Sequence, residues 1–473
     1  MKLLKYLYKR SKPFYIATGV ILVFLLGFAD YKYGYETSFS IFYLFPVIFV
    51  TWYRGKASGF IISFLSAVTW LIADLASGHS YSNYIIPVWN AMVRLGYFSI
   101  VCYLLAFIHR DIDDIKSSIY KGADKSGVYR IAKKQKEGAI ALFYHGVEKK
   151  ITNPLLQELH MPFSLFEKQI MYLKKNFEII SVDDLYGNIK NGHGISPSQV
   201  VVTFDDGYKN NINIVAPFLQ AYNIPFSVYI STSHVSNGSK FSTYYLRTAI
   251  LYTEQQCVNI PSLKMEVDIS SQEKRISAIN DISKIMKRMP QKTKSLLVKD
   301  MINLLPHDRW LELNNIFSSD DPMNWDEIKK LHESGVIIGS HCHDHTILHD
   351  GQSNEEIDYQ LKTSKELIEK HLGACRYFVY PNGGKNLIKS DSILSVKKNG
   401  YLLGFTTVRG EISNGVNQYI LPRLSGYDGY GQHIDSFKFQ MNTASRFNRS
   451  YNKWCRRILS EKSVLIPDSF SNQ

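Results

Sequence analysis

Residues 201–208 read Val-Val-Thr-Phe-Asp-Asp-Gly-Tyr, an apolar strand that ends in two adjacent carboxylates and a glycine. Two carboxylates at the mouth of a buried strand repel each other. Their placement therefore favours separate roles, in which one holds a cation and the other works as a base. A simple Asp-Asp-Gly turn is the alternative, because Asp and Gly both tolerate turn conformations. This motif alone leaves both interpretations open.

A second apolar strand ends in imidazoles. Residues 335–339 read Gly-Val-Ile-Ile-Gly and run directly into Ser-His-Cys-His-Asp-His at 340–345. His341 and His345 are four residues apart, so they share one face if this segment turns helically. Two neutral imidazoles and one carboxylate make a catalytic zinc site with an open position, and Asp206 would complete the set. Three nearby residues are interpreted as lining, outward-facing or ordinary loop side chains: Cys342, His343 and His349.

Both motifs resemble those of the polysaccharide deacetylases, also called the NodB-homology or carbohydrate esterase 4 family. They occur in the family's order, and the resemblance covers roughly residues 140–426. Further similar segments are LFYHGV at 142–147, NWDEI at 324–328, FVYPNG at 378–383 and LPR at 421–423. The resemblance implies an α/β fold, a distorted (β/α) barrel whose active site lies where the strands end.

The resemblance also implies roles for individual residues. Asp206, His341 and His345 would hold a divalent metal, with zinc as the expected ion, and Asp205 would be the base that activates water. Such an ion strengthens water as a nucleophile and polarises the acetyl carbonyl. The backbone N–H of Asn382 would meet the oxyanion that forms during hydrolysis.

The chain departs from the family pattern at two functional positions. Val379 stands where an arginine usually orients the base, so Arg376 or Arg423 is expected to replace it from another direction. The late Leu-x-x-His motif that usually supplies the acid is missing, and His433 fits it poorly. A subgroup that deacetylates exported N-acetylglucosamine polymers begins its domain with Tyr-His-x-Val, which His145 matches. We therefore expect His145 to protonate the leaving amine, with a histidine capping the first strand as the alternative.

The first 110 residues predict an all-α transmembrane bundle of about four helices. Its apolar stretches cover residues 14–29, 39–53, 60–76 and 85–108, with no convincing signal-peptide cleavage site. Lys and Arg gather before the first stretch, between the second and third, and after the fourth. This alternation predicts cytoplasmic termini, whereas a fourth stretch that does not cross would place the catalytic domain outside. Arg94 would pair with Asp30 or Asp74 in the bundle or snorkel toward the outer interface.

The rest of the chain divides by composition. We expect a linker at 111–138, a catalytic domain at 139–435 with a helical insertion at 233–320, and a basic tail at 436–473. The insertion carries a basic run that forms a solvated face, covers the active site or meets anionic lipid headgroups: Lys284, Lys287, Arg288, Lys292 and Lys294. The tail is expected to be a basic amphipathic helix on the membrane or a solvated helix. Five scattered cysteines indicate no disulfide framework, which fits a reducing compartment.

These observations predict a metal-dependent N-deacetylase of the bacterial inner membrane. Its substrate would be an N-acetylated amino sugar in a surface polysaccharide, such as an exopolysaccharide, or in a lipid-linked precursor. The expected partners are this glycan or lipid-linked saccharide, the lipid bilayer and other polysaccharide-biosynthesis proteins. We attribute the net charge of +13 to location at the inner face of the membrane rather than to nucleic-acid binding, because no nucleic-acid-binding motif is present. The alternatives are a deformylase or O-deacetylase on a lipid-linked sugar, and a membrane sensor or binding protein with a degenerate deacetylase-like domain.

Overall fold

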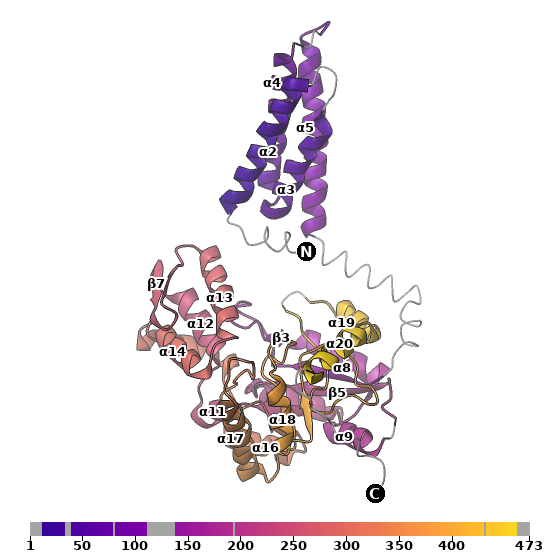
Figure 1. The fold of residues 1–473 in the computed structure, drawn as a ribbon, viewed down its shortest axis with the longest axis vertical. Coiled ribbons are helices and arrows are strands. Elements are labelled where there is room, and N and C mark those ends of the chain that lie inside the picture. The colour runs from indigo at the N-terminus through magenta and orange to yellow at the C-terminus, as the bar shows by residue number, and fades with distance from the viewer. Residues whose placement is uncertain are drawn as a thin grey trace. The chain divides into compact units, whose positions relative to one another are not determined.

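The computed structural model describes residues 12–33, 39–78, 81–110, 138–192, 194–429 and 432–460. The chain divides into two compact units, Met1–Tyr120 and Lys121–Gln473 (Figure 1). Three predicted features lie outside the described residues: the basic segment before Lys12, nearly all of the linker, and the tail beyond residue 460.

The first unit is a bundle of apolar helices (Figure 1). Its elements are α2 (Lys12–Tyr33), the 3-10 turn η1 (Ser40–Tyr43), α3 (Leu44–Arg54), α4 (Lys56–Ala76) and α5 (Ile85–Arg110). Three segments are long and apolar enough to cross a membrane: Phe14–Tyr33, Lys56–Ala76 and Ile85–Leu105. The second predicted stretch is shorter, Ser40–Arg54, and at 1.5 Å per residue it covers about 22 Å of a roughly 30 Å hydrocarbon core. A fourth crossing therefore stays a prediction.

Arg94 lies within the last of these helices. Its guanidinium lies 3.5 Å from the centre of the Trp70 ring, a cation–π contact, and donates to the Asn90 carbonyl at 3.1 Å. The buried Asp30 accepts from the Phe39 N–H at 2.9 Å, and the buried Asp74 accepts from the Tyr81 hydroxyl. The aromatic contact of Arg94 was not anticipated from the sequence.

The second unit is built on a curled, all-parallel sheet. Its strand order is β11-β10-β9-β6-β5-β1-β12, and β4 pairs additionally with β5. The strands are β1 (Ile140–Tyr144), β4 (Glu178–Ile179), β5 (Gln199–Phe204), β6 (Ser227–Ile230), β9 (Ile337–Ser340), β10 (Tyr377–Val379), β11 (Leu403–Phe405) and β12 (Leu424–Ser425). The two ends of this order approach each other, because Phe405 in β11 forms an isolated parallel bridge with Leu421, just before β12. The predicted distorted barrel is confirmed.

Apolar runs form the central strands because both of their faces are covered. In β5, Val200, Val201 and Val202 are all buried, as expected for a parallel strand between helical layers. The surrounding helices are α8 (Phe163–Asn176), α9 (Val182–Asn191), α10 (Ala216–Ala221), α16 (Trp325–Glu333), α17 (Asn354–Leu372), α18 (Ser390–Lys398), α19 (Ile434–Asn442) and α20 (Asn448–Ser460).

The insertion after β6 has its own hydrophobic core, which includes Leu246, Ile282 and Leu297. Its helices are α11 (Thr232–Asn237), α12 (Ser242–Tyr252), α13 (Gln272–Met286), α14 (Gln291–Ile302) and α15 (His307–Ile316). An antiparallel hairpin of β7 (Cys257–Ile260) and β8 (Met265–Asp268) interrupts the predicted helical pattern.

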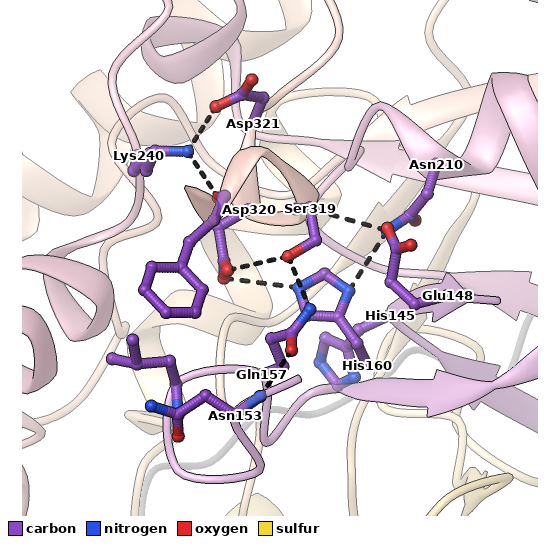
Figure 2. Close-up of polar contacts among 12 residues, drawn as sticks. His145, Glu148, Asn153, Gln157, His160, Asn210, Lys240, Ser319, Asp320 and Asp321 are labelled. Carbon is purple, nitrogen blue, oxygen red and sulfur yellow. Dashed lines mark hydrogen bonds and ion pairs between the residues drawn. The ribbon is translucent and has the colours of Figure 1, made fainter. Parts of the chain in front are cut away.

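The insertion rejoins the barrel at a buried polar junction (Figure 2). His160 in β3 (His160–Pro162), which pairs with β2 (Gly146–Glu148), places its Nε2 3.3 Å from Asp320 Oδ1. Asn210 approaches His160 Nδ1 at 3.2 Å and donates to Glu148 at 3.0 Å. This network fixes the insertion against β2, the strand that directly follows His145.

The C-terminal helix α20 does not present its apolar side to lipid. Tyr451, Trp454 and Ile458 are buried in the barrel core, and the Trp454 indole donates to the Lys385 carbonyl at 2.9 Å. The four exposed basic residues lie on its outer side: Arg449, Lys453, Arg456 and Arg457. The prediction of an apolar face lying in the membrane is therefore wrong. The boundary expected at residue 435 falls inside α19, which also packs on the barrel.

Candidate active site

The sequence-predicted site residues meet where parallel strands end. Asp205 and Asp206 follow β5, His341 follows β9, and His145 follows β1. The carboxyl ends of parallel strands form one edge of a barrel, so residues far apart in the chain converge there.

Asp206, His341 and His345 form a compact cluster. One potential ligand atom from each lies within 4.8 Å of the others. Asp206 Oδ1 is 3.5 Å from His341 Nε2 and 3.3 Å from His345 Nε2. This oxygen is buried and accepts no hydrogen bond from the described residues. A buried carboxylate oxygen that faces two imidazole nitrogens fits a divalent cation, and zinc accepts this donor set.

His341 is prepared to be a ligand. Its Nδ1 donates to the Val379 carbonyl at 2.8 Å, which leaves the Nε2 lone pair directed at Asp206. Burial lowers the pKa of His341 to about 4, so the ring is neutral near pH 7. His345 packs edge-on against Phe241, with ring centres 5.1 Å apart.

Left-handed backbone conformations, rather than a helical turn, bring the ligands together. The segment 341–346 is a loop in which φ is +65° at Cys342 and +51° at His345. Asp206 (φ +74°) and Asn382 (φ +54°) adopt the same region. Such conformations are costly for residues other than glycine and gather at functional sites. The segment does not turn helically, which was the condition under which the spacing places His341 and His345 on one face, yet the two rings do meet.

Arg423 holds Asp205 in a buried, bidentate ion pair. Its Nη1 donates to Oδ1 at 2.8 Å and its Nη2 to Oδ2 at 2.7 Å, while its Nε donates to the Thr406 carbonyl at 3.0 Å. Arg423 is fully buried and Asp205 is 2% exposed. Burial raises the pKa of Asp205, but the Arg423 guanidinium, together with His341 and His145, outweighs this effect and holds the pKa below its usual value.

Arg376, the other candidate orienting group, lies elsewhere. Its guanidinium pairs with Asp183 at 3.3 Å, and both side chains are at least 40% exposed. The suggestion that Arg376 orients the base is therefore corrected. Arg423 reaches Asp205 because it precedes β12, which pairs with β1 next to β5.

The polysaccharide deacetylase family model matches residues 194–403. These residues form a polysaccharide deacetylase domain. The matched segment contains both aspartates, both histidines of the cluster and Asn382, but neither His145 nor Arg423. For this segment the match supports a hydrolase that acts on amide bonds.

Similarity to solved structures is distant. The deacetylase PplD of Streptococcus pyogenes, in complex with acetate, has 15% identity and a TM-score of 0.42, with 64% of this chain and 97% of that chain covered. IcaB from Ammonifex degensii has 16% identity and a TM-score of 0.42, with coverages of 65% and 97%. The de-N-acetylase of Aggregatibacter actinomycetemcomitans has 17% identity and a TM-score of 0.37, with coverages of 64% and 99%. No curated protein matches. At these TM-scores the similarities do not identify the activity.

Two other predicted site residues, His145 and Asn382, lie at the same edge of the barrel. His145 is partly buried, packs edge-on to Phe143 with ring centres 5.8 Å apart, and interacts electrostatically with both Asp205 and Asp206. The N–H of Asn382 donates to no carbonyl or side chain in the described part of the chain. It is therefore free to donate to a ligand.

The sequence alone did not identify Tyr208 as a site residue. It also did not decide among the three roles considered for the basic run that includes Lys294. Tyr208 is buried, and burial together with the Asp206 carboxylate holds its pKa well above the usual value, so the phenol stays protonated. Tyr208 is the last residue of the 201–208 motif, and this position was the signal in the sequence that could have identified it. Lys294 is buried in α14 and its Nζ donates to the His345 carbonyl at 3.2 Å. The solvated-face interpretation of the basic run is thus wrong for Lys294, whereas the other four cations are exposed.

Proposed function

We propose that this chain is a metal-dependent N-deacetylase that hydrolyses the acetamide of an N-acetylated amino sugar, in a surface polysaccharide or its lipid-linked precursor. The products would be acetate and a free amine. The observation that carries the proposal is the buried Asp206 oxygen facing two imidazole nitrogens, beside a second carboxylate with a lowered pKa.

Each residue has a role in this reaction. A divalent cation held by Asp206, His341 and His345 would strengthen water as a nucleophile and polarise the acetyl carbonyl. Asp205 accepts the proton of the attacking water; it is ionised at neutral pH, and each of its oxygens keeps a lone pair beyond the bond to Arg423. Arg423 fixes the direction of that carboxylate.

The remaining steps fall to two groups at the same edge of the barrel. His145 protonates the nitrogen of the leaving amine, a general-acid role that histidine side chains often take in catalysis. The unpaired N–H of Asn382 donates to the developing oxyanion. Neither step needs a group from the membrane unit.

Purified full-length protein tests this proposal directly. We expect one divalent metal, zinc, per chain by elemental analysis, and acetate release from N-acetylated glucosamine oligosaccharides. Asp205→Asn should retain the metal and lose activity. Absence of stoichiometric metal in the wild type, or full activity of Asp205→Asn, contradicts the proposal.

We further propose that the protein is a multi-pass protein of the bacterial inner membrane with a cytoplasmic catalytic unit. Three candidate spanning helices support the membrane location. A cytoplasmic catalytic unit also requires the shorter apolar segment Ser40–Arg54 to cross, which gives four spans, and the alternating basic residues of the sequence favour that arrangement. A cytoplasmic site would favour a lipid-linked precursor on the inner leaflet. A reporter that is active only in the cytoplasm, fused after Gln473, should be active, and silence would place the catalytic unit outside.

A further inference from the structure

A cavity of about 290 Å³ lies beside the proposed metal site. His345 and Asp344 form one wall, helix α14 contributes Gln291, Lys294 and Lys299, and residues around the start of α12, such as Tyr245, complete it. The size is near the lower limit of ligand pockets, about 300 Å³. Helix α14 belongs to the insertion, so this cavity is a feature that the insertion adds to the barrel.

The cavity carries an excess of positive charge. Lys294 lies in the wall and Lys299 is exposed, whereas Asp344 is the acidic residue of the lining. Asp344 accepts from the Gln360 amide at 2.8 Å. Lys240 also lines the cavity, but its Nζ is bound to Asp321 and to the Phe317 carbonyl (Figure 2).

Polar groups that suit a sugar accompany these charges. The side-chain oxygen of Gln291 is buried and has no hydrogen-bond partner within the described residues. Ser233, Ser242 and Ser295 also line the space. An unpaired buried acceptor is costly unless a ligand donates to it, and a sugar hydroxyl can do so.

We propose that this cavity binds a phosphate group attached to the amino sugar next to its acetamide. The inference rests on the proposed deacetylase function. In a 2-acetamido sugar, the carbon that bears the amide neighbours the anomeric carbon, so a phosphate on the anomeric carbon lies beside the amide. A lipid-linked precursor carries phosphate at this carbon, whereas an internal residue of a polymer carries a neutral glycosidic oxygen. The two cations therefore select the precursor over the finished polymer.

The test compares two ligands that differ only at the anomeric carbon. Full-length, zinc-loaded protein in detergent is titrated calorimetrically with the 1-phosphates of N-acetylglucosamine and N-acetylgalactosamine and with their methyl glycosides. The Asp205→Asn background keeps the amide intact. We expect at least one phosphate to bind about tenfold more tightly than its glycoside, since charge-assisted hydrogen bonds contribute on this order. Lys299→Met should abolish most of this preference.

Lys292→Met is the matched control, because Lys292 is exposed on the same helix and does not line the cavity. It should keep the preference. Equal affinity for phosphate and glycoside, equal losses in both lysine variants, or tighter binding of inorganic phosphate than of either sugar phosphate overturns the inference. Acetate release by the wild type is measured separately. Preference without acetate release contradicts the proposed function alone, whereas acetate release without preference contradicts only the phosphate site.

Discussion

Replacing Arg423 by methionine should leave the proposed base, Asp205, in place and remove the cation that compensates its charge. Arg423 is fully buried and binds both oxygens of Asp205, at 2.8 and 2.7 Å. Methionine keeps an unbranched apolar side chain but donates no hydrogen bond. The variant therefore leaves the Asp205 carboxylate buried without its cation.

The expected loss of stability is large. Removing one partner of a buried ion pair costs about 3–5 kcal/mol, because the remaining charge is uncompensated. The Asp205 pKa is below its unfolded value in the wild type, so this carboxylate stabilises the fold above the unfolded pKa, and the contribution is lost as pH falls through the folded pKa. Without Arg423, burial raises the Asp205 pKa above the unfolded value. The destabilisation should accordingly be greater at pH 7 than at pH 4.

Two measurements follow from this change in Asp205. Thermal unfolding of the metal-loaded protein should show the pH-dependent loss, and the acidic limb of the acetate-release profile should move to higher pH because the base is protonated more readily. Arg423→Lys keeps the positive charge but lacks the planar guanidinium that binds both carboxylate oxygens. Its thermal stability and its acidic limb should therefore lie between those of the wild type and Arg423→Met. Arg376→Met is the matched control, because its pair with Asp183 is exposed and contributes at most about 1 kcal/mol. An unchanged acidic limb in Arg423→Met, or a larger defect in Arg376→Met, would refute the reasoning.

Three further predictions concern the remaining site residues. Asp206→Asn should lose stoichiometric metal and activity together, whereas Asp205→Asn should lose activity alone, by roughly 10²–10⁴-fold; elemental analysis beside the acetate assay distinguishes them. His145→Gln should retain metal and lower kcat by a similar factor, while the exposed His433→Gln should leave both unchanged; equal activity of the two variants rejects His145 as the acid. In the metal-free protein, Asp206→Asn should unfold at a lower temperature than the wild type near pH 7, because burial raises the pKa of Asp206 but the nearby histidines, His345 first, lower it below its usual value, so the ionised carboxylate stabilises the fold; a higher temperature contradicts this sign.

Much of the site could be predicted because strand patterning and strand topology agree. The apolar runs of β5, β9 and β10 each end in polar motifs, and parallel strands bring those ends together. The loop geometry at Cys342 and His345 could not be predicted. Positive φ values at residues other than glycine leave no compositional signal, so a four-residue spacing suggested a helix instead.

The choice between the two arginines depends on barrel closure, which local sequence does not encode. Only the placement of β12 beside β1 puts Arg423 on Asp205. Helix α20 shows a similar limit: its amphipathic pattern was consistent with either lipid or protein as the apolar partner. Packing of Trp454 in the barrel core decides between them, because a single apolar face cannot serve both.

Neighbouring aspartates acquire unequal roles because different groups surround each of them. The charge of Asp205 is matched by a guanidinium that takes both of its oxygens. Asp206 turns away through a left-handed backbone and presents Oδ1 to the nitrogens of His341 and His345. Burial raises the pKa of Asp206, but His345 and the other nearby histidines outweigh this effect and hold the pKa below its usual value, so Asp206 is ionised near pH 7. A divalent cation at this point would offset the charge and use both imidazole lone pairs, so Asp206 is suited to be a ligand while Asp205 remains available as the base.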